Sequence, residues 1–320
     1  MQSIKDAAFS FHALLQKHRK VTILSHINPD ADAIGTALGI YSWLKEQKYQ
    51  VEVVNASKDI PLFLDFLPHF SKIKQRMDFD NSLIIACDSG SRDRLGYDLE
   101  DSVIVNIDHH STNTNFGVLN IVDPSAVSSS EVAFQLLKSL EHPVSRESAI
   151  AFYAALVSDT RNFTTNNMHQ GIFALASQMV GLGIDIAEVS QKMLHRRSLA
   201  SLRILGTALQ SLELRESARI AILKISQEDI KHSGAKMSDL DGVVDYAKSL
   251  ATVEIAMMLV ERKGEIKVSL RSKNVDVAGV ALVFGGGGHN VAAGFEVKGN
   301  VMTVLVDAII EEISRQGLLK

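Results

Sequence analysis

Short apolar runs that alternate with amphipathic segments dominate the first half of the chain. Runs of strand length occupy residues 21–25, 51–54, 83–87 and 103–107, and the first leads into a helical pattern over residues 32–47. Near-continuous apolar strands separated by helices are typical of a parallel sheet that is covered on both faces. The pattern therefore predicts an α/β fold whose N-terminal domain is a parallel sheet with helices on both faces.

From residue 129 the apolar positions take a helical period. Helices are expected over residues 146–158, 170–180 and 186–209, after an earlier helix that one of the serines at 128–130 can cap. Strands return in the last third of the chain. The elements expected there are a strand over 218–225, a helix over 243–250, strands over 252–260 and 266–270, and a closing helix over 302–314.

These patterns predict two domains. We expect a larger domain over residues 1–190, a helical connector over 191–214, and a smaller α/β domain over 215–320. A total of 320 residues agrees with two domains, because domains are commonly about 100 to 200 residues long.

The composition narrows the class of protein. Lys and Arg number 33 against 37 Asp and Glu, a net charge of −4, so a broad basic surface for long duplex nucleic acid is not expected. Short or small anionic substrates remain compatible with this charge. One cysteine, Cys87, excludes an intrachain disulfide and a cysteine-rich metal cluster. No apolar run approaches about 18 residues, so we expect a soluble cytoplasmic protein with no membrane partner.

Acidic and histidine residues directly follow several of the predicted strands. Parallel strands end at one edge of a sheet, and open α/β sheets bind ligands at that edge. A further acidic residue ends an apolar helical run. The residues in question are His26, Asp30 and Asp32 after the first strand, Asp88 after the third, Asp108, His109 and His110 after the fourth, and Asp159 after the helix.

A single Asp after a strand is more often a turn or cap residue than a ligand, and Asp32 alone could cap the helix that it begins. Several clusters that obey one positional rule instead indicate a shared site. Converging carboxylates would repel one another, but two divalent cations would balance Asp30, Asp32, Asp88 and Asp159. Carboxylate and imidazole ligands favour Mn²⁺ or Mg²⁺ over cysteine-type zinc sites, and paired ions suit attack on a phosphate ester.

The same residues resemble the motifs of the DHH phosphoesterase superfamily. The match comprises His26-Ile-Asn-Pro-Asp-Ala-Asp-Ala-Ile-Gly35, Asp88, the Asp108-His-His triplet and Asp159-Thr160. The segment 285–294 resembles the signature of the DHH-associated C-terminal domain. Among members of the superfamily, a compact two-domain chain is similar to the nanoRNase/pAp-phosphatase branch, the bifunctional oligoribonucleases. Ala31, Thr36 and Arg161 depart from residues that are frequent in the family, and none of them removes a ligand.

The resemblance implies an active site with two metal ions in a cleft between the domains, Mn²⁺ ahead of Mg²⁺, and Asp88 as the bridging ligand. The implied ligands are His26, Asp30 and Asp88 for one ion and Asp32, Asp88, His109 and Asp159 for the other. Asp108 would orient a ligand imidazole. His110 would act beside the metals, on the scissile phosphate or the leaving group.

The glycine run at residues 285–288 has two interpretations. It lacks the Lys-Ser/Thr ending of a nucleotide P-loop, and by itself it fits a flexible turn before a helix equally well. Alternatively, its amides could hold a phosphate at a helix N-terminus, together with the guanidinium of Arg271. The residues that the resemblance implies for substrate binding are Arg271, Ser272, Gly287, Gly288 and His289.

The resemblance implies hydrolysis of short oligoribonucleotides to mononucleotides, with 3′-phosphoadenosine 5′-phosphate as a further substrate. The expected partners are short RNA and small phosphorylated nucleotides, and a homodimer through the N-terminal domain is compatible with the family. The alternative is a phosphodiesterase for cyclic dinucleotides or their linear products. A non-catalytic nucleotide sensor is a weaker hypothesis because every metal ligand is retained. The Gly-Gly-Gly-His sequence argues against a pyrophosphatase, and the chain length argues against a recombination exonuclease.

Overall fold

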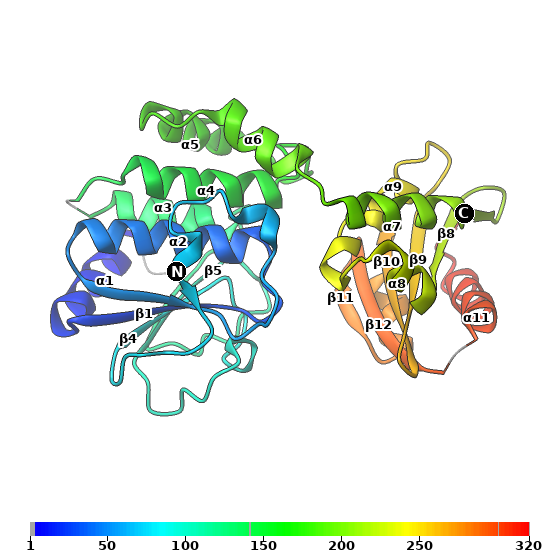
Figure 1. The fold of residues 1–320 in the computed structure, drawn as a ribbon, viewed down its shortest axis with the longest axis horizontal. Coiled ribbons are helices and arrows are strands. Elements are labelled where there is room, and N and C mark those ends of the chain that lie inside the picture. The colour runs from blue at the N-terminus through cyan, green and yellow to red at the C-terminus, as the bar shows by residue number, and fades with distance from the viewer. Residues whose placement is uncertain (1–3, 141, 300, 320) are drawn as a thin grey trace. The chain divides into compact units, whose positions relative to one another are not determined.

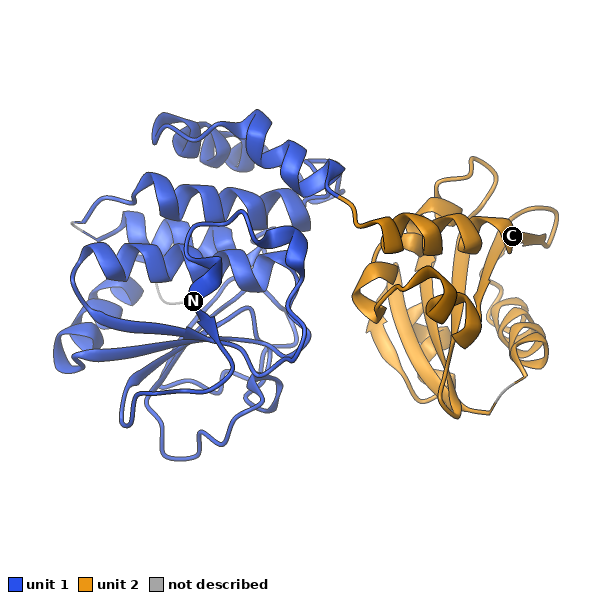
Figure 2. Ribbon diagram, viewed as in Figure 1, with its two compact units in different colours: residues 1–196 blue, residues 197–320 orange. Residues whose placement is uncertain are grey.

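The structure, a computed structural model, describes residues 4–140, 142–299 and 301–319. It divides into two compact units, Met1–Arg196 and Arg197–Lys320 (Figure 2). The boundary lies between α6 (Ile186–His195) and α7 (Leu199–Gln210). The single helix expected over 186–209 is therefore wrong. Arg196 has an extended backbone, and the Ser198 side chain starts a new helix by accepting a hydrogen bond from the amide of Ser201.

Unit 1 contains a six-stranded sheet in the order β3-β2-β1-β4-β5-β6, in which all neighbouring strands are parallel. The sequence predicts a parallel sheet and four of these strands, and it misses β3 and β6 at the two edges. The strands are β1 (Lys20–Ser25), β2 (Gln50–Val54), β3 (Ile73–Lys74), β4 (Leu83–Cys87), β5 (Ile104–Asp108) and β6 (Leu119–Val122). The chain moves outward in one direction from β1 and in the other from β4. The strand order thus reverses between β1 and β4, the type of switch point at which open α/β sheets bind ligands.

Helices of unit 1 lie over one face of this sheet (Figure 1). They are α1 (Ile4–Lys17), α2 (Ala31–Glu46), α3 (Ser129–Lys138) and α4 (Arg146–Asp159), while α5 (Gln170–Gly181) and α6 pack on α4. On the other face, Leu24 and Ile84 pack against Leu95 and Leu99 from the β4–β5 connection. The expectation of helices on both faces is thereby corrected. In the described part of this connection the only helix is the short 3-10 helix η3 (Asp93–Leu95), because the segment is rich in turn-forming Asp, Gly and Ser.

Unit 2 contains a mixed sheet in the order β11-β12-β10-β9-β8-β7, in which β8 and β9 are parallel and the other neighbours antiparallel. Its strands are β7 (Glu213–Arg215), β8 (Ile220–Ile225), β9 (Ile255–Arg262), β10 (Glu265–Ser272), β11 (Gly287–His289) and β12 (Ala292–Lys298). One face packs on α10 (Ala278–Val283) and α11 (Met302–Arg315). On the other face, α7 and α9 (Val243–Lys248) cover β8 and β9, next to α8 (Gln227–Ser233).

Membrane-spanning potential is weak among the described residues. No single helix there has both the length and the apolar composition to cross a bilayer, and the bent pair α5 and α6 meets these criteria only when taken together.

Two glycines let α2 and α4 approach closely. A Cβ atom at Gly35 would lie 2.6 Å from the carbonyl oxygen of Ala151, and one at Gly39 would lie 2.3 Å from the ring of Phe152. Gly35 is part of the motif that carries Asp30 and Asp32. Helix α2 therefore presents its first turn to the sheet edge from a position that close packing against α4 determines.

We predict that Gly35→Ala lowers the free energy of unfolding by about 1 to 3 kcal/mol, because the methyl group meets backbone atoms that cannot rotate away. Gly206→Ala is the matched control, since its Cβ in α7 would contact nothing within 4 Å. The control should be neutral or stabilising by up to about 1 kcal/mol. Urea unfolding of both variants tests this, and equal stability of wild type and Gly35→Ala would contradict it.

Candidate metal centre

The acidic and histidine residues singled out in unit 1 lie together at the carboxyl edge of its sheet. His26 follows β1, Asp88 follows β4, and His109 follows β5. Asp159 is the last residue of α4 and joins them from the helical layer, with an oxygen 3.5 Å from Nε2 of His109. The edge is the one on which β1 and β4 mark the reversal of strand order.

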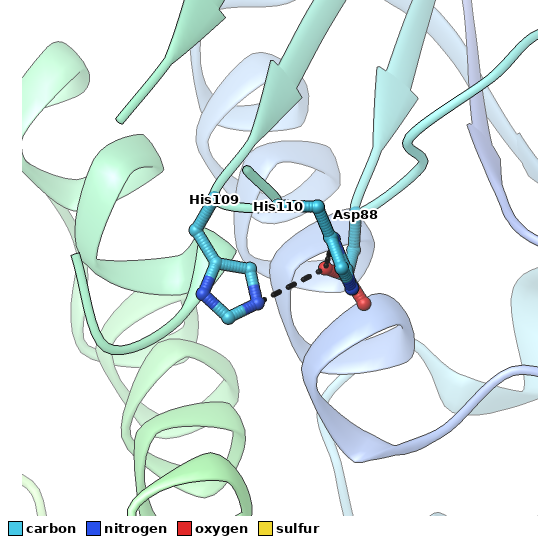
Figure 3. A group of neighbouring side chains, drawn as sticks. All are labelled: Asp88, His109 and His110. Carbon is cyan, nitrogen blue, oxygen red and sulfur yellow. Dashed lines mark ion pairs between the residues drawn. The ribbon is translucent and has the colours of Figure 1, made fainter. Parts of the chain in front are cut away.

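Asp88 lies between the two sides of the cluster, and Figure 3 shows it beside His109 and His110. Its Oδ2 is 3.5 Å from Nε2 of His26, whereas its Oδ1 is 3.7 Å from Nε2 of His109 and 3.6 Å from Nδ1 of His110. Its backbone is left-handed, with φ of 55°, and its amide donates to the carbonyl of Ile107. Such conformations are costly for residues other than glycine and cluster at functional sites. The two carboxylate oxygens of Asp88 thus face different imidazoles.

Three groups of side chains bring possible metal-binding atoms within 4.8 Å of one another. They are His26 with Asp30 and Asp88, Asp32 with His109 and Asp159, and Asp88 with His109 and His110. The first group contains the residues expected for one ion, and the second contains three of the four residues expected for the other. The fourth, Asp88, lies 3.7 Å from His109 of the second group. Carboxylate and imidazole atoms are the donors that Mn²⁺ and related divalent ions accept. The residues present therefore fit a divalent metal centre.

Asp30, and not Asp32, caps α2. The Oδ1 of Asp30 accepts a hydrogen bond from the amide of Ala33 at 3.0 Å, which satisfies one of the free amides of the first turn. The cap side chain is exposed, whereas Asp32 is completely buried. The cap interpretation that was open for Asp32 is thus wrong.

Asp32 is held by the start of a different helix. Its two carboxylate oxygens accept hydrogen bonds from the amides of Ser129 at 2.7 Å and Ser130 at 3.1 Å, at the N-terminus of α3. The hydroxyl of Thr36 donates a third bond, at 3.1 Å. A carboxylate has about four lone-pair positions, so three donors leave Asp32 about one position for a metal ion. Its geometry suits a ligand that contributes one oxygen.

Burial and mutual repulsion disfavour ionisation of the deepest carboxyls. Burial, and then the charges of Asp88 and Asp30, raise the pKa of Asp32 well above its ordinary value. Burial, followed by the charge of Asp32, does the same to the pKa of Asp159. Burial alone would also raise the pKa of Asp88, but the histidines around it outweigh burial and lower that pKa to about 2. Bound cations would relieve this repulsion and favour the ionised forms of Asp32 and Asp159.

Asp108 orients His110. The buried carboxylate accepts from Nδ1 of His110 at 2.7 Å and from Nδ2 of Asn113 at 2.5 Å. The imidazole of the expected ligand His109 instead has its Nδ1 3.3 Å from the carbonyl oxygen of Ala126. From its sequence motif, Asp108 is expected to orient the imidazole of a metal ligand. In the structure it orients His110, which is not among the expected ligands. The hydrogen bond from His110 to Asp108 raises the pKa of His110 against the opposing effect of burial.

Sequence reasoning missed several residues that surround the cluster. Ser129 contacts two acids, Asn113 holds Asp108, and Arg94 places Nη2 3.3 Å from Nδ1 of His26. The serine run at 128–130 was visible as a cap, and Ser128 is indeed the N-cap of α3. Nothing in the local pattern showed that the next two amides reach Asp32, because 97 residues separate Ser129 from it in the chain.

In unit 2, strand register places Arg271 and His289 on one face of the sheet. Both residues are paired with Ala292, Arg271 from β10 and His289 from β11. Directly paired residues point to the same side of a sheet, and the alternate β10 positions, such as Leu270, are buried in the core on the opposite side. Arg271 and His289 thus flank Ala292, whose side chain is small. Ser272 points the other way, is 3% exposed, and donates its hydroxyl to the carbonyl of Val275.

Most of the glycine run has a structural explanation. The amides of Gly285 and Gly286 bond to the carbonyls of Leu282 and Ala281, which closes α10 in a Schellman motif. A Cβ at Gly286 would lie 2.2 Å from the carbonyl oxygen of Gly294, and Gly288 has φ of 146°. The run follows a helix C-terminus and leads into β11, so the expected phosphate site at a helix N-terminus is wrong. Gly287 alone combines an ordinary φ with open space.

Comparison with known families matches both units. Residues 20–157 match the model of the DHH family N-terminal domain, and residues 217–315 match the DHHA1 domain. The first match lies within unit 1 and the second within unit 2.

Curated relatives match along nearly their whole length. The chain is 29% identical over 309 residues to the bifunctional oligoribonuclease and PAP phosphatase NrnA of Thermus thermophilus, covering 93% of this chain and 92% of the relative. It is 26% identical over 277 residues to the protein of the same name from Bacillus subtilis, covering 85% and 87%.

Solved structures show the same fold. An exopolyphosphatase-related protein from Bacteroides fragilis superimposes with a TM-score of 0.89 at 26% identity, covering 97% of both chains. RecJ from Thermus thermophilus, in complex with Mn²⁺, has a TM-score of 0.61 at 15% identity, covering 99% of this chain and 55% of RecJ. The motif residues gathered at the sheet edge, the two family matches and the relatives agree: the chain belongs to the DHH family and carries a DHHA1 domain after its DHH domain.

Proposed function

We propose that this protein is a metal-dependent phosphoesterase that hydrolyses short oligoribonucleotides to mononucleotides and 3′-phosphoadenosine 5′-phosphate to AMP. The observation that supports metal-dependent chemistry is the position of Asp88, whose two oxygens face two separate groups of candidate ligands. The substrates follow from the NrnA relatives, which are named as oligoribonucleases and PAP phosphatases.

The proposed centre holds two divalent ions, Mn²⁺ ahead of Mg²⁺. One would be held by His26, Asp30 and Asp88, and the other by Asp32, Asp88, His109 and Asp159. When bound, such ions supply positive charge that polarises a phosphate and activates water. The buried carboxylates, which resist ionisation without a cation, support this assignment.

His110 is proposed to handle the proton of the leaving group. The Asp108 carboxylate can only accept a hydrogen bond, so Nδ1 of His110 carries a proton and Nε2 remains available for the reaction. A raised pKa suits a general acid that must be protonated near neutral pH. Arg271, Gly287 and His289 of unit 2 are proposed to bind a second phosphate or the terminal nucleotide of the substrate. Ser272 is proposed to act through the shape of the sheet, since its hydroxyl donates to the carbonyl of Val275. Gly288 is proposed to do so by allowing β12 to approach, since a Cβ there would lie 2.5 Å from the carbonyl oxygen of Ala292.

We predict that the full-length protein with Mn²⁺ degrades a dinucleotide carrying a 5′-phosphate and releases phosphate from 3′-phosphoadenosine 5′-phosphate. A long RNA, assayed in parallel, should be a poor substrate, because the few substrate contacts and the net charge of −4 do not favour a long polyanion. Cyclic di-AMP and pyrophosphate, assayed in the same way, should also be poor substrates. Equal attack on long RNA would contradict the short-substrate assignment. A preference for cyclic di-AMP would favour the alternative phosphodiesterase.

Asp88→Asn should lower kcat on both substrates by about 10³-fold or more, because it removes the charge shared by both ions. Asparagine tolerates the left-handed backbone of residue 88, so the fold should persist. Asp101→Asn, at an exposed position in unit 1, is the control and should be active. Normal turnover by Asp88→Asn would disprove the bridging role.

Stabilisation by Mn²⁺ should increase with pH. The raised pKa values of Asp32 and Asp159 mean that the folded, metal-free protein retains protons that the unfolded chain has released, so its stability falls as pH rises above the ordinary aspartate range. Mn²⁺ competes with those protons. The rise in Tm on adding Mn²⁺ should therefore be larger at about pH 8 than at about pH 5, and an Asp32→Asn, Asp159→Asn variant should lose most of this dependence. A Tm shift that does not change with pH would contradict the prediction.

Arg271→Ala should raise KM by about tenfold or more with little change in kcat. A change of this size is expected when one hydrogen bond to a charged group is lost. Lys267→Ala is the matched control, since Lys267 lies on the same face of β10, four residues away. A variant with normal KM and lost kcat would instead assign Arg271 to the transition state.

A further inference from the structure

Ser129 contacts both halves of the metal centre. It is the first residue of α3 and is completely buried. Its hydroxyl donates to Oδ1 of Asp88 at 2.8 Å, and its amide donates to Oδ2 of Asp32 at 2.7 Å. Ser129 thus connects Asp88, which faces both ligand groups, with Asp32, which belongs to only one of them.

The neighbouring serines do not share this arrangement. Ser128 accepts the amide of Glu131 and so caps α3, and its hydroxyl lies 2.7 Å from that of Ser130. Ser130 reaches Asp32 only through its backbone amide. The hydroxyl of Ser129 also lies 3.5 Å from Oδ1 of Asp108, farther than from Asp88. Among the three serines, Ser129 is therefore the one whose side chain meets the acidic cluster.

We propose that Ser129 is a positioning residue, which sets the orientation of the Asp88 carboxylate relative to Asp32 and thereby the geometry of a two-ion centre. This inference rests on the proposed function only in requiring that the chain bind two divalent ions. Ser129 is assigned no contact with substrate.

The physical basis is the freedom of a carboxylate to rotate. Oδ1 of Asp88 offers two lone pairs, and the Ser129 hydroxyl occupies one of them. The other remains available on an oxygen that lies 3.7 Å from Nε2 of His109. The donor is itself rigid, because the backbone of Ser129 begins a capped helix and its amide is bonded to Asp32. Without the hydroxyl, the Asp88 carboxylate could turn, and a buried acceptor would lose its partner.

The test uses the metal-free, full-length protein and Mn²⁺ alone. Titration calorimetry, with free Mn²⁺ followed by electron paramagnetic resonance, measures the number of bound ions and their Kd. Ser129→Ala keeps the amide and loses the hydroxyl, and should weaken binding of at least one ion by about 10 to 100-fold. Ser129→Thr should restore affinity to near the wild-type value. Ser130→Ala is the matched control and should bind like wild type, because its amide remains and its hydroxyl contacts only Ser128.

Thermal unfolding without metal separates positioning from a general structural role. A positioning role predicts that Ser129→Ala and Ser130→Ala have similar Tm values without metal but different Kd values for Mn²⁺. If Ser129→Ala does not fold, Ser129→Gly, which also lacks the hydroxyl, takes its place with the same expected loss.

Wild-type affinity for both ions in the variant that lacks the hydroxyl would overturn the proposal, as would weakening of the Ser130→Ala control to the same degree. Failure of the wild-type protein to bind two ions would overturn both this proposal and the proposed metal centre. If the wild type and the variants bind Mn²⁺ as predicted but the wild type hydrolyses neither proposed substrate, the result would contradict the proposed function alone. It would still support the role of Ser129.

Discussion

Buried like charges at the carboxyl edge of the unit 1 sheet are the constraint around which this part of the molecule is organised. Asp32, Asp88 and Asp159 lie close together, and two of them resist ionisation because burial and mutual repulsion act in the same direction. The fold answers this cost in two ways. It surrounds Asp88 with imidazoles, which hold its pKa at about 2, and it directs the amides of a helix N-terminus at Asp32. The negative charge that these groups leave uncompensated is the charge that divalent ions would balance.

Helix packing determines whether those compensating groups reach the acids. Helix α2 carries Asp32, and its glycines allow α4, which ends in Asp159, to approach closely. Helix α3 contacts both α2 and α4 and presents its first amides to the same carboxylate. The positions of the proposed metal ligands therefore depend on the separation of three helices as much as on the ends of the strands, and small residues at the contacts set that separation.

The second unit illustrates how one sequence feature can combine structural and functional demands. The glycine run ends a helix, passes close to β12 and enters a strand, and these steps account for three of its four glycines. The remaining one, Gly287, lies in a strand whose register aligns His289 with Arg271 on one face. The proposed binding surface on this unit would thus owe its shape to strand pairing, which places Ala292 between Arg271 and His289.

The sequence by itself determined the parallel sheet, the strand ends and the convergence of His26, Asp88 and His109. It could do so because all strands of a parallel sheet end at the same edge. It could not determine that Asp30 caps α2 while Asp32 is held by α3, that Asp108 serves His110, or that Ser272 faces the core. The contact that holds Asp32 joins it to Ser129, 97 positions away in the chain. The partners of Asp30, Asp108 and Ser272 lie only two or three positions away, but which of the available neighbours each side chain meets depends on how its segment is packed. Local periodicity carries no information on such contacts, and the tertiary structure decides them by the way the helices pack.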